Sequence, residues 1–248
     1  WIPENCIQCT QCSYICPHAT IRAFLLNEDE KEKAPESLKV LDSKGIKGDE
    51  KLYFSIGVTP LDCTGCGNCA QVCPAPGKAL VIKSQDSQHE QIEAWNYYME
   101  RVKPKNPLNK YTLKGSQFER PLLEFNGACA GCGETPYARL VTQLFGDRMM
   151  IANATGCSSI WAAGSYEMAY TINEHGHGPA WANSLFEDNA EFGYGMYLGV
   201  KTIRERIANN VTIALESNMS EETKTVLREW LDNKDIGDGT RAVSYTHL

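Results

Sequence analysis

The stretch CIQCTQCSYICP at residues 6–17 decides the first half of the fold, and its pattern returns as CTGCGNCAQVCP at residues 63–74. Each copy spaces its cysteines as C-x2-C-x2-C-x3-C and adds a proline. This run is typical of bacterial proteins that hold two [4Fe–4S] clusters. Its members here are Cys6, Cys9, Cys12, Cys16, Cys63, Cys66, Cys69 and Cys73. Because so long a pattern seldom repeats by chance, we expect two clusters.

In such a run the first three thiolates surround one cluster, and the fourth cysteine ligates the other cluster. The expected sets are therefore Cys6, Cys9 and Cys12 with Cys73, and Cys63, Cys66 and Cys69 with Cys16. Gly65 and Gly67 should let the second loop approach the inorganic core and aim backbone N–H groups at its sulfurs. Zinc sites usually combine two separated cysteine pairs, which fits this run poorly. Disulfides are disfavoured because nothing in the sequence indicates secretion.

Length and composition are those of an ordinary globular chain. The 248 residues predict one or two domains, with 42% hydrophobic and 22% charged residues. A net charge of -7 without a long basic stripe argues against nucleic acid as a partner. No apolar run reaches the roughly 18 residues that a membrane span needs, and no export signal is visible. We expect a cytoplasmic protein, and Trp1 as the first residue predicts an internal piece of a longer chain.

The first half should form one domain over residues 1–115, with an insertion at about 20–62 between the cysteine runs. Residues 21–26 and 52–56 predict strands, and the charged stretch 27–36 predicts a solvated loop. Residues 79–82 predict the strand that closes such a unit. A packed helix is expected over about 91–102, followed by a proline- and glycine-marked linker.

The second half predicts alternating strands and helices. Residues 122–125 and 149–152 are expected strands. A glycine-rich turn precedes a helix that runs from Thr135, as N-cap, with Pro136 in its first turn and Gly146 at its end. Residues 155–159 turn into another helix. Strand, glycine-rich turn and helix in repetition indicate a parallel α/β layer, whose helix N-termini can face an anionic ligand.

Three further cysteines, Cys129, Cys132 and Cys157, supply three ligands of a four-thiolate site, and a fourth ligand must lie outside this sequence. From spacing alone, a structural zinc site or unrelated buried thiols are equally open. Four histidines are interpreted as turn, surface or incidental residues: His18, His89, His175 and His177. Acidic residues begin a helix near residue 187, where they favour the macrodipole, and its apolar continuation to about residue 203 predicts core packing.

Three longer stretches add a family resemblance: GACAGCGETPY at residues 127–137, NATGCSSIW at 153–161 and GPAWANSLFEDNAE at 178–191. With the doubled cysteine run, they make the chain resemble pyruvate:ferredoxin (flavodoxin) oxidoreductase, a thiamine-diphosphate enzyme, over essentially its whole length. The resemblance implies an α+β ferredoxin-like 2[4Fe–4S] domain. It also implies that residues 116–248 form the truncated N-terminal part of an α/β thiamine-diphosphate-binding domain.

The same resemblance implies that Cys129, Cys132 and Cys157 hold a third [4Fe–4S] cluster. It further implies that Glu134, Cys157 and Ser158 lie at thiamine diphosphate, which binds with magnesium. The implied reaction is oxidative decarboxylation of pyruvate with coenzyme A to acetyl-CoA and CO2. Electrons would pass through the clusters to ferredoxin or flavodoxin, in a homodimer.

Two departures limit what this stretch should do alone. The family's Gly-Asp-Gly magnesium motif is missing, and Gly237-Asp238-Gly239 stands in a different context, so we interpret it as a turn. The pyruvate and coenzyme A domains should precede Trp1, and the last four residues fit nothing in the family. We therefore expect no pyruvate turnover by these 248 residues alone. The alternative function is a polyferredoxin-like electron-transfer subunit of another 2-oxoacid oxidoreductase.

Overall fold

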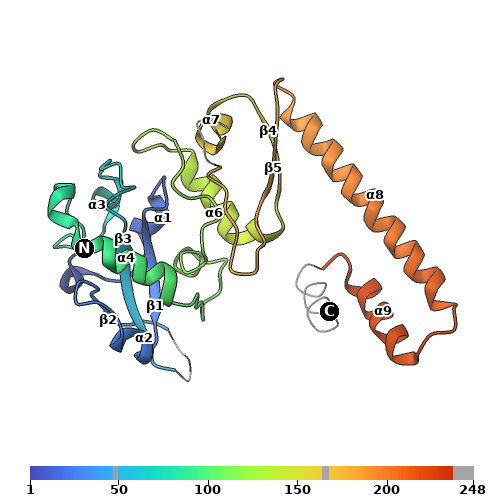
Figure 1. Ribbon diagram of the computed structural model, residues 1–248, viewed down its shortest axis with the longest axis horizontal. Helices are drawn as coiled ribbons and strands as arrows, with labels where there is room; N and C mark the ends of the chain where they lie inside the picture. Colours follow the sequence, from blue (N-terminus) through green and yellow to red (C-terminus); the bar gives the residue numbers. More distant parts are fainter. Residues whose placement is uncertain (47, 49, 164–167, 237–248) are drawn as a thin grey trace. The chain divides into compact units, whose positions relative to one another are not determined.

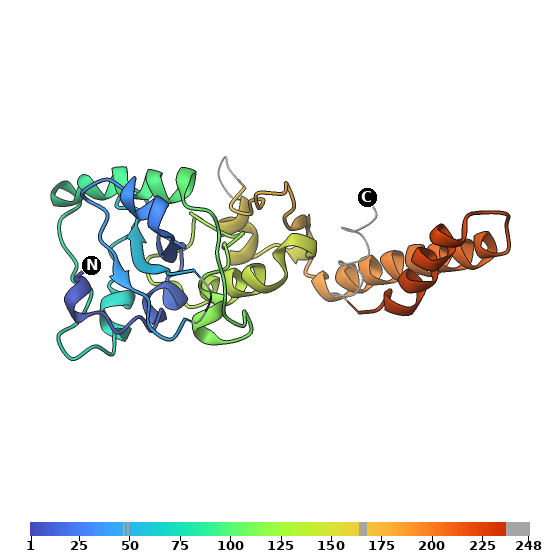
Figure 2. The same ribbon diagram turned by 90° about the horizontal axis from the view of Figure 1, so that it is seen from below.

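The computed structural model describes residues 1–46, 48, 50–163 and 168–236. It divides into two compact units, Trp1–Glu187 and Asp188–Leu248. Figures 1 and 2 trace the elements along the chain from blue to red. The first unit contains both cysteine runs, all the strands in the described ranges, and Cys129, Cys132 and Cys157. The predicted boundary near residue 115 lies inside this first unit.

A three-stranded antiparallel sheet with the order β1-β3-β2 forms the centre of the cysteine-rich half. Strand β3 (Tyr53–Val58) pairs along its whole length with β1 (Ile21–Leu26), from Tyr53 opposite Leu26 to Val58 opposite Ile21. The short strand β2 (Leu41–Asp42) adds to its other edge. Both long strands are apolar and buried almost throughout, as their β-branched and aromatic content predicts. The two predicted strands are confirmed.

Alternation along these strands separates two hydrophobic clusters, because successive side chains of a strand point to opposite faces. One face carries Ile21, Ala23 and Leu25 with Phe54 and Ile56, and packs toward Cys16 and the cysteine loops. The opposite face packs on α4 (Glu90–Arg101) through Ala94 and Tyr98. The Tyr98 ring stacks on Phe24 with centroids 4.2 Å apart. The predicted helix over 91–102 is therefore confirmed, and the sheet is the platform under the cysteine loops.

Short helices carry the cysteine runs. Cys12 lies in α1 (Gln11–Ile15) and Cys69 in α3 (Asn68–Val72), and these two helices contact each other. The single turn η1 (Pro3–Asn5) precedes Cys6. The remaining short elements of this half are α2 (Glu28–Glu32), η2 (Gln85–Gln88) and α5 (Leu113–Ser116).

Two sequence predictions for this half are wrong. Residues 27–36 were expected to be a loop but contain the helix α2, which begins with a capping box between Asn27 and Glu30. The pattern Asn-x-x-Glu is a helix-start signal that the dense charge obscured. Residues 79–82 form no strand: Ala79 accepts from the Ile2 N–H and donates to Cys73 Sγ, but no neighbouring strand pairs with the segment. Val81 and Ile82 are about half exposed, so this segment lacks a neighbouring strand.

The second part of the first unit is a small α/β arrangement. Helix α6 (Thr135–Phe145) leads through η3 (Gly146–Arg148) to β4 (Met150–Ala154) and then α7 (Cys157–Ala163). Strand β5 (Ala180–Ser184) pairs with β4 in parallel, which confirms the predicted parallel layer. The expected strand at 122–125 is reduced to an isolated bridge between Leu123 and Tyr170. Thr135 is the first residue of α6 rather than its N-cap: Glu134 takes the N-cap position without a side-chain capping bond, and the Thr135 side chain is fully buried.

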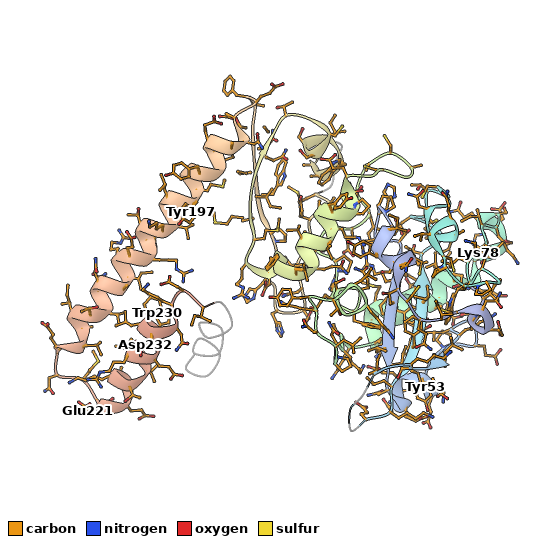
Figure 3. The ribbon with its side chains drawn as sticks, turned by 180° about the vertical axis from the view of Figure 1, so that it is seen from behind. Tyr53, Lys78, Tyr197, Glu221, Trp230 and Asp232 are labelled. Carbon is orange, nitrogen blue, oxygen red and sulfur yellow. The ribbon has the colours of Figure 1, made fainter. Side chains whose placement is uncertain are left out.

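The second unit is helical within its described residues. It consists of α8 (Asn189–Leu215) and α9 (Glu221–Asn233), which contact each other; α9 is capped by the Ser220 side chain. Figure 3 shows Tyr197 on α8 and Trp230 on α9. No residue of α8 is buried, so the predicted core packing of this helix is wrong for the described structure. None of the helices in the described ranges is long and apolar enough to cross a membrane.

A buried ion pair links α2 to the segment after α4 and gives a pH-dependent prediction. Glu30 accepts from the Lys105 ammonium and the Lys103 backbone N–H, and it completes the capping box. Burial by itself would raise the pKa of Glu30, but these donors outweigh it and hold the pKa below its ordinary value of 4.5. Ionised Glu30 therefore stabilises the folded state above that ordinary value, and this stabilisation is lost as the pH falls through the lowered pKa.

Replacing Glu30 by Gln should lower the free energy of unfolding at pH 7 by about 2 kcal/mol, because Lys105 loses its anionic partner. The difference from wild type should shrink below about pH 4.5, where the carboxyl protonates in the unfolded chain. Thermal unfolding followed by circular dichroism at several pH values measures both effects. The control is Glu32→Gln on the exposed side of the same helix, which should change little. An equal loss in the two variants at pH 7 contradicts the assignment.

Candidate metal and cofactor sites

The first cysteine loop lines a small, mostly apolar cavity together with the last cysteine of the second run. Around this cavity lie Cys6, Cys9, Cys12 and Cys73, with Trp1, Ala75, Ala79 and Leu80. Two backbone N–H groups donate to its sulfurs, from Gln8 to Cys6 at 3.4 Å and from Ala79 to Cys73 at 3.3 Å. N–H···S contacts of this kind tune the reduction potential of an iron–sulfur cluster.

A second, larger groove reverses the roles of the two runs. Cys63, Cys66 and Cys69 line it together with Cys16, the last cysteine of the first run. Pro17, His18, Gly65 and Gly67 are part of the same wall. Each run thus contributes three cysteines to one site and its fourth cysteine to the other. This lining agrees with the crossed ligand sets expected from the spacing, and the ligation itself stays a prediction.

The electrostatics of both sites fit a positively charged inorganic core. Burial raises the pKa of the Cys69 thiol to about 11, and the charges of Cys16 and Cys63 add to it. Burial likewise raises the pKa of the Cys12 thiol, and the nearby charge of Cys69 contributes. Clustered thiolates in apolar surroundings repel one another, so they require cationic metal between them. The coupling of Cys12 to Cys69 also indicates that the two sites are neighbours.

Each of the two cavities is lined by four cysteines. Within the described ranges, no three His, Cys, Asp or Glu side chains converge closely enough to hold a single metal ion. A zinc ion requires four sulfurs at about 2.3 Å from one point. Four cysteines around a cavity instead suit a cluster whose irons are distributed over its corners.

The same backbone conformation recurs in three cysteine loops. The second residue after the first cysteine is left-handed in each: Gln8 with φ 60°, Gly65 with φ 67° and Gly131 with φ 75°. Thr10 and Gly67 share a second left-handed position, directly before α1 and α3. The loop around Cys129 and Cys132 also has the N–H···S contact, from Glu134 to Cys132 at 3.4 Å. The third loop therefore shares the left-handed position after its first cysteine with the first two loops.

The side chain of Gln8 connects the loop of Cys6 and Cys9 to the insertion at about residues 20–62. A left-handed non-glycine residue costs about 1–2 kcal/mol, so the side chain must offset it. The amide of Gln8 is buried, donates to the Asp42 carbonyl at 2.8 Å and accepts from the Lys44 N–H at 2.8 Å. The insertion thus holds the loop of Cys6 and Cys9 in shape, which no local sequence signal could have indicated.

The third cysteine loop lies directly against the second. A Cβ on Gly131 would stand 3.6 Å from both the Cβ of Cys66 and the side chain of Asn68. Three further bonds join the residues after Cys16 to those before Cys129. Asn126 donates to the Pro17 carbonyl at 2.8 Å, the Phe125 N–H donates to the His18 carbonyl at 2.9 Å, and His18 Nε2 contacts the Ala128 carbonyl at 2.9 Å. His18 is buried and structural, although a lone histidine carried no signal in the sequence.

Trp161 connects the candidate cofactor residues. Its Nε1 donates to Glu134 Oε2 at 3.3 Å, and its backbone carbonyl accepts from the Gly127 N–H. Trp161 belongs to α7, which begins with Cys157 and Ser158 at the carboxyl end of β4. Burial, with the charge of Glu134, raises the pKa of Tyr170 to about 12. The structure thus ties the Glu134 loop to the helix of Cys157 and Ser158.

Parallel strands place two loops together at their carboxyl ends. Thr155, after β4, donates to the carbonyl of Ser184, the last residue of β5, at 3.2 Å. Asn153 and Asn183 are hydrogen-bonded across the strands at 2.6 Å. In α/β proteins, ligands bind outside the carboxyl ends of the strands. Cys157 is exposed at this edge.

The other candidate residues lie elsewhere. His175 and His177 are exposed in a turn whose backbone N–H groups donate to the Asn173 side chain, as the sequence predicted. Gly237-Asp238-Gly239 and the last four residues lie outside the described residues.

Comparison with known proteins identifies first the class of domain. Residues 5–76 match the family model of the 4Fe-4S dicluster domain. Both cysteine runs fall within that match, so this part of the chain is a two-cluster iron–sulfur domain of the ferredoxin-like kind.

The particular relatives are oxidoreductases of pyruvate. The chain is 57% identical over 241 residues to the pyruvate-flavodoxin oxidoreductase of Klebsiella pneumoniae, covering 97% of this chain and 20% of that protein. It is 54% identical to the pyruvate:ferredoxin oxidoreductase of Moorella thermoacetica, covering 97% and 21%. A pyruvate dehydrogenase [NADP(+)] of Euglena gracilis is 46% identical, with 97% and 13% covered. The resemblance found in the sequence is confirmed, and the chain spans about a fifth of the length of the first two relatives.

The left-handed loop positions give a prediction about the second run. Replacing Gly67 by Ala should lower the free energy of unfolding by about 1 kcal/mol, because φ is 81° there and disfavours any Cβ. The matched control is Gly48→Ala, since neither position has an atom within 4 Å of the added methyl and Gly48 is not left-handed. Anaerobic thermal unfolding measures the difference. Equal midpoints for the two variants would be inconsistent with backbone strain in this loop.

Proposed function

We propose that this chain is the electron-transfer segment of a pyruvate:ferredoxin (flavodoxin) oxidoreductase, joined to the beginning of its thiamine-diphosphate-binding domain. The complete enzyme oxidatively decarboxylates pyruvate with coenzyme A to acetyl-CoA and CO2. The observation that carries the proposal is the pair of neighbouring sites, each lined by three cysteines of one run and the fourth of the other. Similarity over 97% of the chain to enzymes named for pyruvate and flavodoxin or ferredoxin supports the substrate and the acceptor.

In this proposal, Cys6, Cys9, Cys12 and Cys73 ligate one [4Fe–4S] cluster. Cys16, Cys63, Cys66 and Cys69 ligate the other. Cys129, Cys132 and Cys157 supply three ligands of a third cluster, and its fourth ligand lies outside this sequence. The contact of Gly131 with the Cys66 loop supports a linear order in which the Cys16 cluster occupies the middle. The cluster of the Cys6 loop is then the outer one, from which ferredoxin or flavodoxin takes electrons.

Glu134, Cys157 and Ser158 are proposed to lie at thiamine diphosphate and its magnesium. When bound, the cofactor supplies the electron sink for decarboxylation. The chain's own contribution is positional: Trp161 orients the Glu134 carboxylate, and the carboxyl ends of β4 and β5 bring the Thr155 and Ser184 loops together. Both features agree with a cofactor site at this edge of an α/β domain. Clusters that accept single electrons then divide a two-electron oxidation into two steps.

The alternative is an electron-transfer subunit that only docks on a catalytic partner. It needs the two-cluster domain but not the arrangement of Glu134, Trp161 and α7 around the third loop. That arrangement favours the enzyme. We further propose a cytoplasmic homodimer, as the family resemblance implies.

Turnover by the complete natural protein tests the proposal directly. Purified without oxygen, it should reduce flavodoxin or ferredoxin only when pyruvate, coenzyme A and thiamine diphosphate are all present. Acetyl-CoA should form in proportion to the electrons transferred. A protein that accepts electrons from a partner but consumes no pyruvate supports the electron-transfer subunit instead.

Crossed ligation predicts an unusual pattern of cluster loss. Replacing Cys73 by Ala should damage the cluster of the Cys6 loop, and replacing Cys16 by Ala should damage the cluster of the Cys63 loop. Each substitution should remove up to about four irons of one cluster. Iron quantitation with EPR of the reduced protein, using Cys9→Ala and Cys66→Ala as references for the two signals, identifies the cluster affected. Loss of the Cys63-loop signal in Cys73→Ala would refute the crossed sets.

Glu134→Gln separates the cofactor site from the clusters. We expect pyruvate-dependent reduction to fall by about tenfold or more, the effect of losing about 1.4 kcal/mol of cofactor positioning by the carboxylate that Trp161 holds. Reduction of the clusters by dithionite should be unchanged, because Glu134 ligates no iron. Glu90→Gln, an exposed carboxylate on α4, is the control. Full pyruvate-dependent activity in Glu134→Gln would contradict the assignment of Glu134 to the thiamine diphosphate site.

A further inference from the structure

Arg139 is a completely buried cation whose charge has no carboxylate beside it. It lies on α6 with 0% of its surface exposed. Its Nη2 donates to the Tyr14 carbonyl at 2.6 Å and its Nη1 to Gln117 Oε1 at 3.2 Å, both neutral acceptors. Its Nε has no partner in the described part of the chain. A buried guanidinium in this state is strongly unfavourable unless an anion balances it.

A neighbouring arginine shows the contrast. Arg22 is equally buried, but its guanidinium pairs with the carboxylate of Glu124, which Arg120 also approaches. Glu119 and Glu174 line the same cavity as Arg139, yet among the described interactions neither is ion-paired with it. Glu119 instead accepts from Asn106 at 2.6 Å. Arg139 is therefore the buried cation that the protein's carboxylates leave unbalanced in this region.

The contacts of Arg139 place it beside the end of the first cysteine run. Burial lowers the pKa of Arg139 to about 10, and the charge of Cys16 is the largest influence in the opposite direction. The Tyr14 carbonyl that Arg139 binds belongs to the last turn of α1, two residues before Cys16. Arg139 is thus held by a hydrogen bond two residues from Cys16, and α6, which carries it, packs against α1.

We propose that Arg139 is the buried counter-charge of the cluster ligated by Cys16, Cys63, Cys66 and Cys69, and that it raises the reduction potential of that cluster. This inference rests on the ligand set proposed above. A [4Fe–4S] core with four thiolates is anionic, and reduction adds one electron and one further negative charge. A fixed cation therefore stabilises the reduced form more than the oxidised form. Little screening by bulk solvent is expected, because the Arg139 side chain is fully buried.

The position of Arg139 gives this effect a use. The Cys16 cluster is the middle one in the proposed order, between the third cysteine loop and the outer cluster. Stabilising its reduced form favours electron arrival from the third site. Arg139 would act through the cluster's charge alone, because it is assigned no contact with substrate or thiamine diphosphate.

Potentiometric EPR titration of the complete, anaerobically purified protein tests the inference. The signal that disappears in Cys16→Ala identifies the cluster to be followed. In Arg139→Gln its equilibrium constant for one-electron reduction should fall at least tenfold, which corresponds to a potential about 59 mV lower. Arg139→Lys keeps the charge and should remain close to wild type. Lys33→Gln removes an exposed cation of α2's C-cap and should move no potential.

Each outcome has a defined meaning. A selective shift of the Cys16 cluster, restored by Lys, supports the proposal, as does loss of that cluster in Arg139→Gln with retention at normal potential in Arg139→Lys. An unshifted potential in Arg139→Gln overturns it. Loss of the cluster in both variants also overturns it, because Arg139 is then required for structure through its bond to Tyr14 rather than for charge. Absence of clusters from the wild-type protein is a different result and contradicts the proposed function itself.

Discussion

Thiolates cannot share an apolar cavity with one another unless metal cations lie between them, and this constraint organises the cysteine-rich half of the chain. Cys12 and Cys69 are each shifted toward the protonated state by burial and by neighbouring sulfurs. Because each cavity is lined by three cysteines of one run and the last cysteine of the other, the two runs must fold together to form either cavity. The sheet of β1 and β3 then provides the apolar surface on which both loops rest.

Polar groups around the two sites hold the cysteine loops in position. N–H groups approach the sulfurs from left-handed loop positions, and the Gln8 side chain holds one of these positions through the insertion. The bonds of Asn126 and His18 join the third cysteine loop to the residue pair after Cys16. Transfer of single electrons between clusters requires that the cluster-binding loops lie close together and keep fixed positions. The fold therefore suits a row of closely spaced iron–sulfur clusters better than it suits isolated metal ions.

Features encoded locally were predictable from the sequence. Cysteine spacing indicated the two sites, continuous apolar runs indicated β1 and β3, and Pro136 at the start with Gly146 at the end indicated α6. Features that depend on a distant partner were not. Residues 79–82 have strand-like side chains but no adjacent strand, and α8 has apolar positions but no buried one. Gln8, His18 and Arg139 acquire their roles from residues 34 to 125 positions away.

Anomalous diffraction at the iron absorption edge, from crystals of the anaerobically purified complete protein, tests the central claim most directly. It should locate two cubane clusters in the dicluster domain, with Cys73 on the cluster of the Cys6 loop and Cys16 on the cluster of the Cys63 loop. Iron bound to the four cysteines of a single run, or zinc in place of iron, would contradict the account.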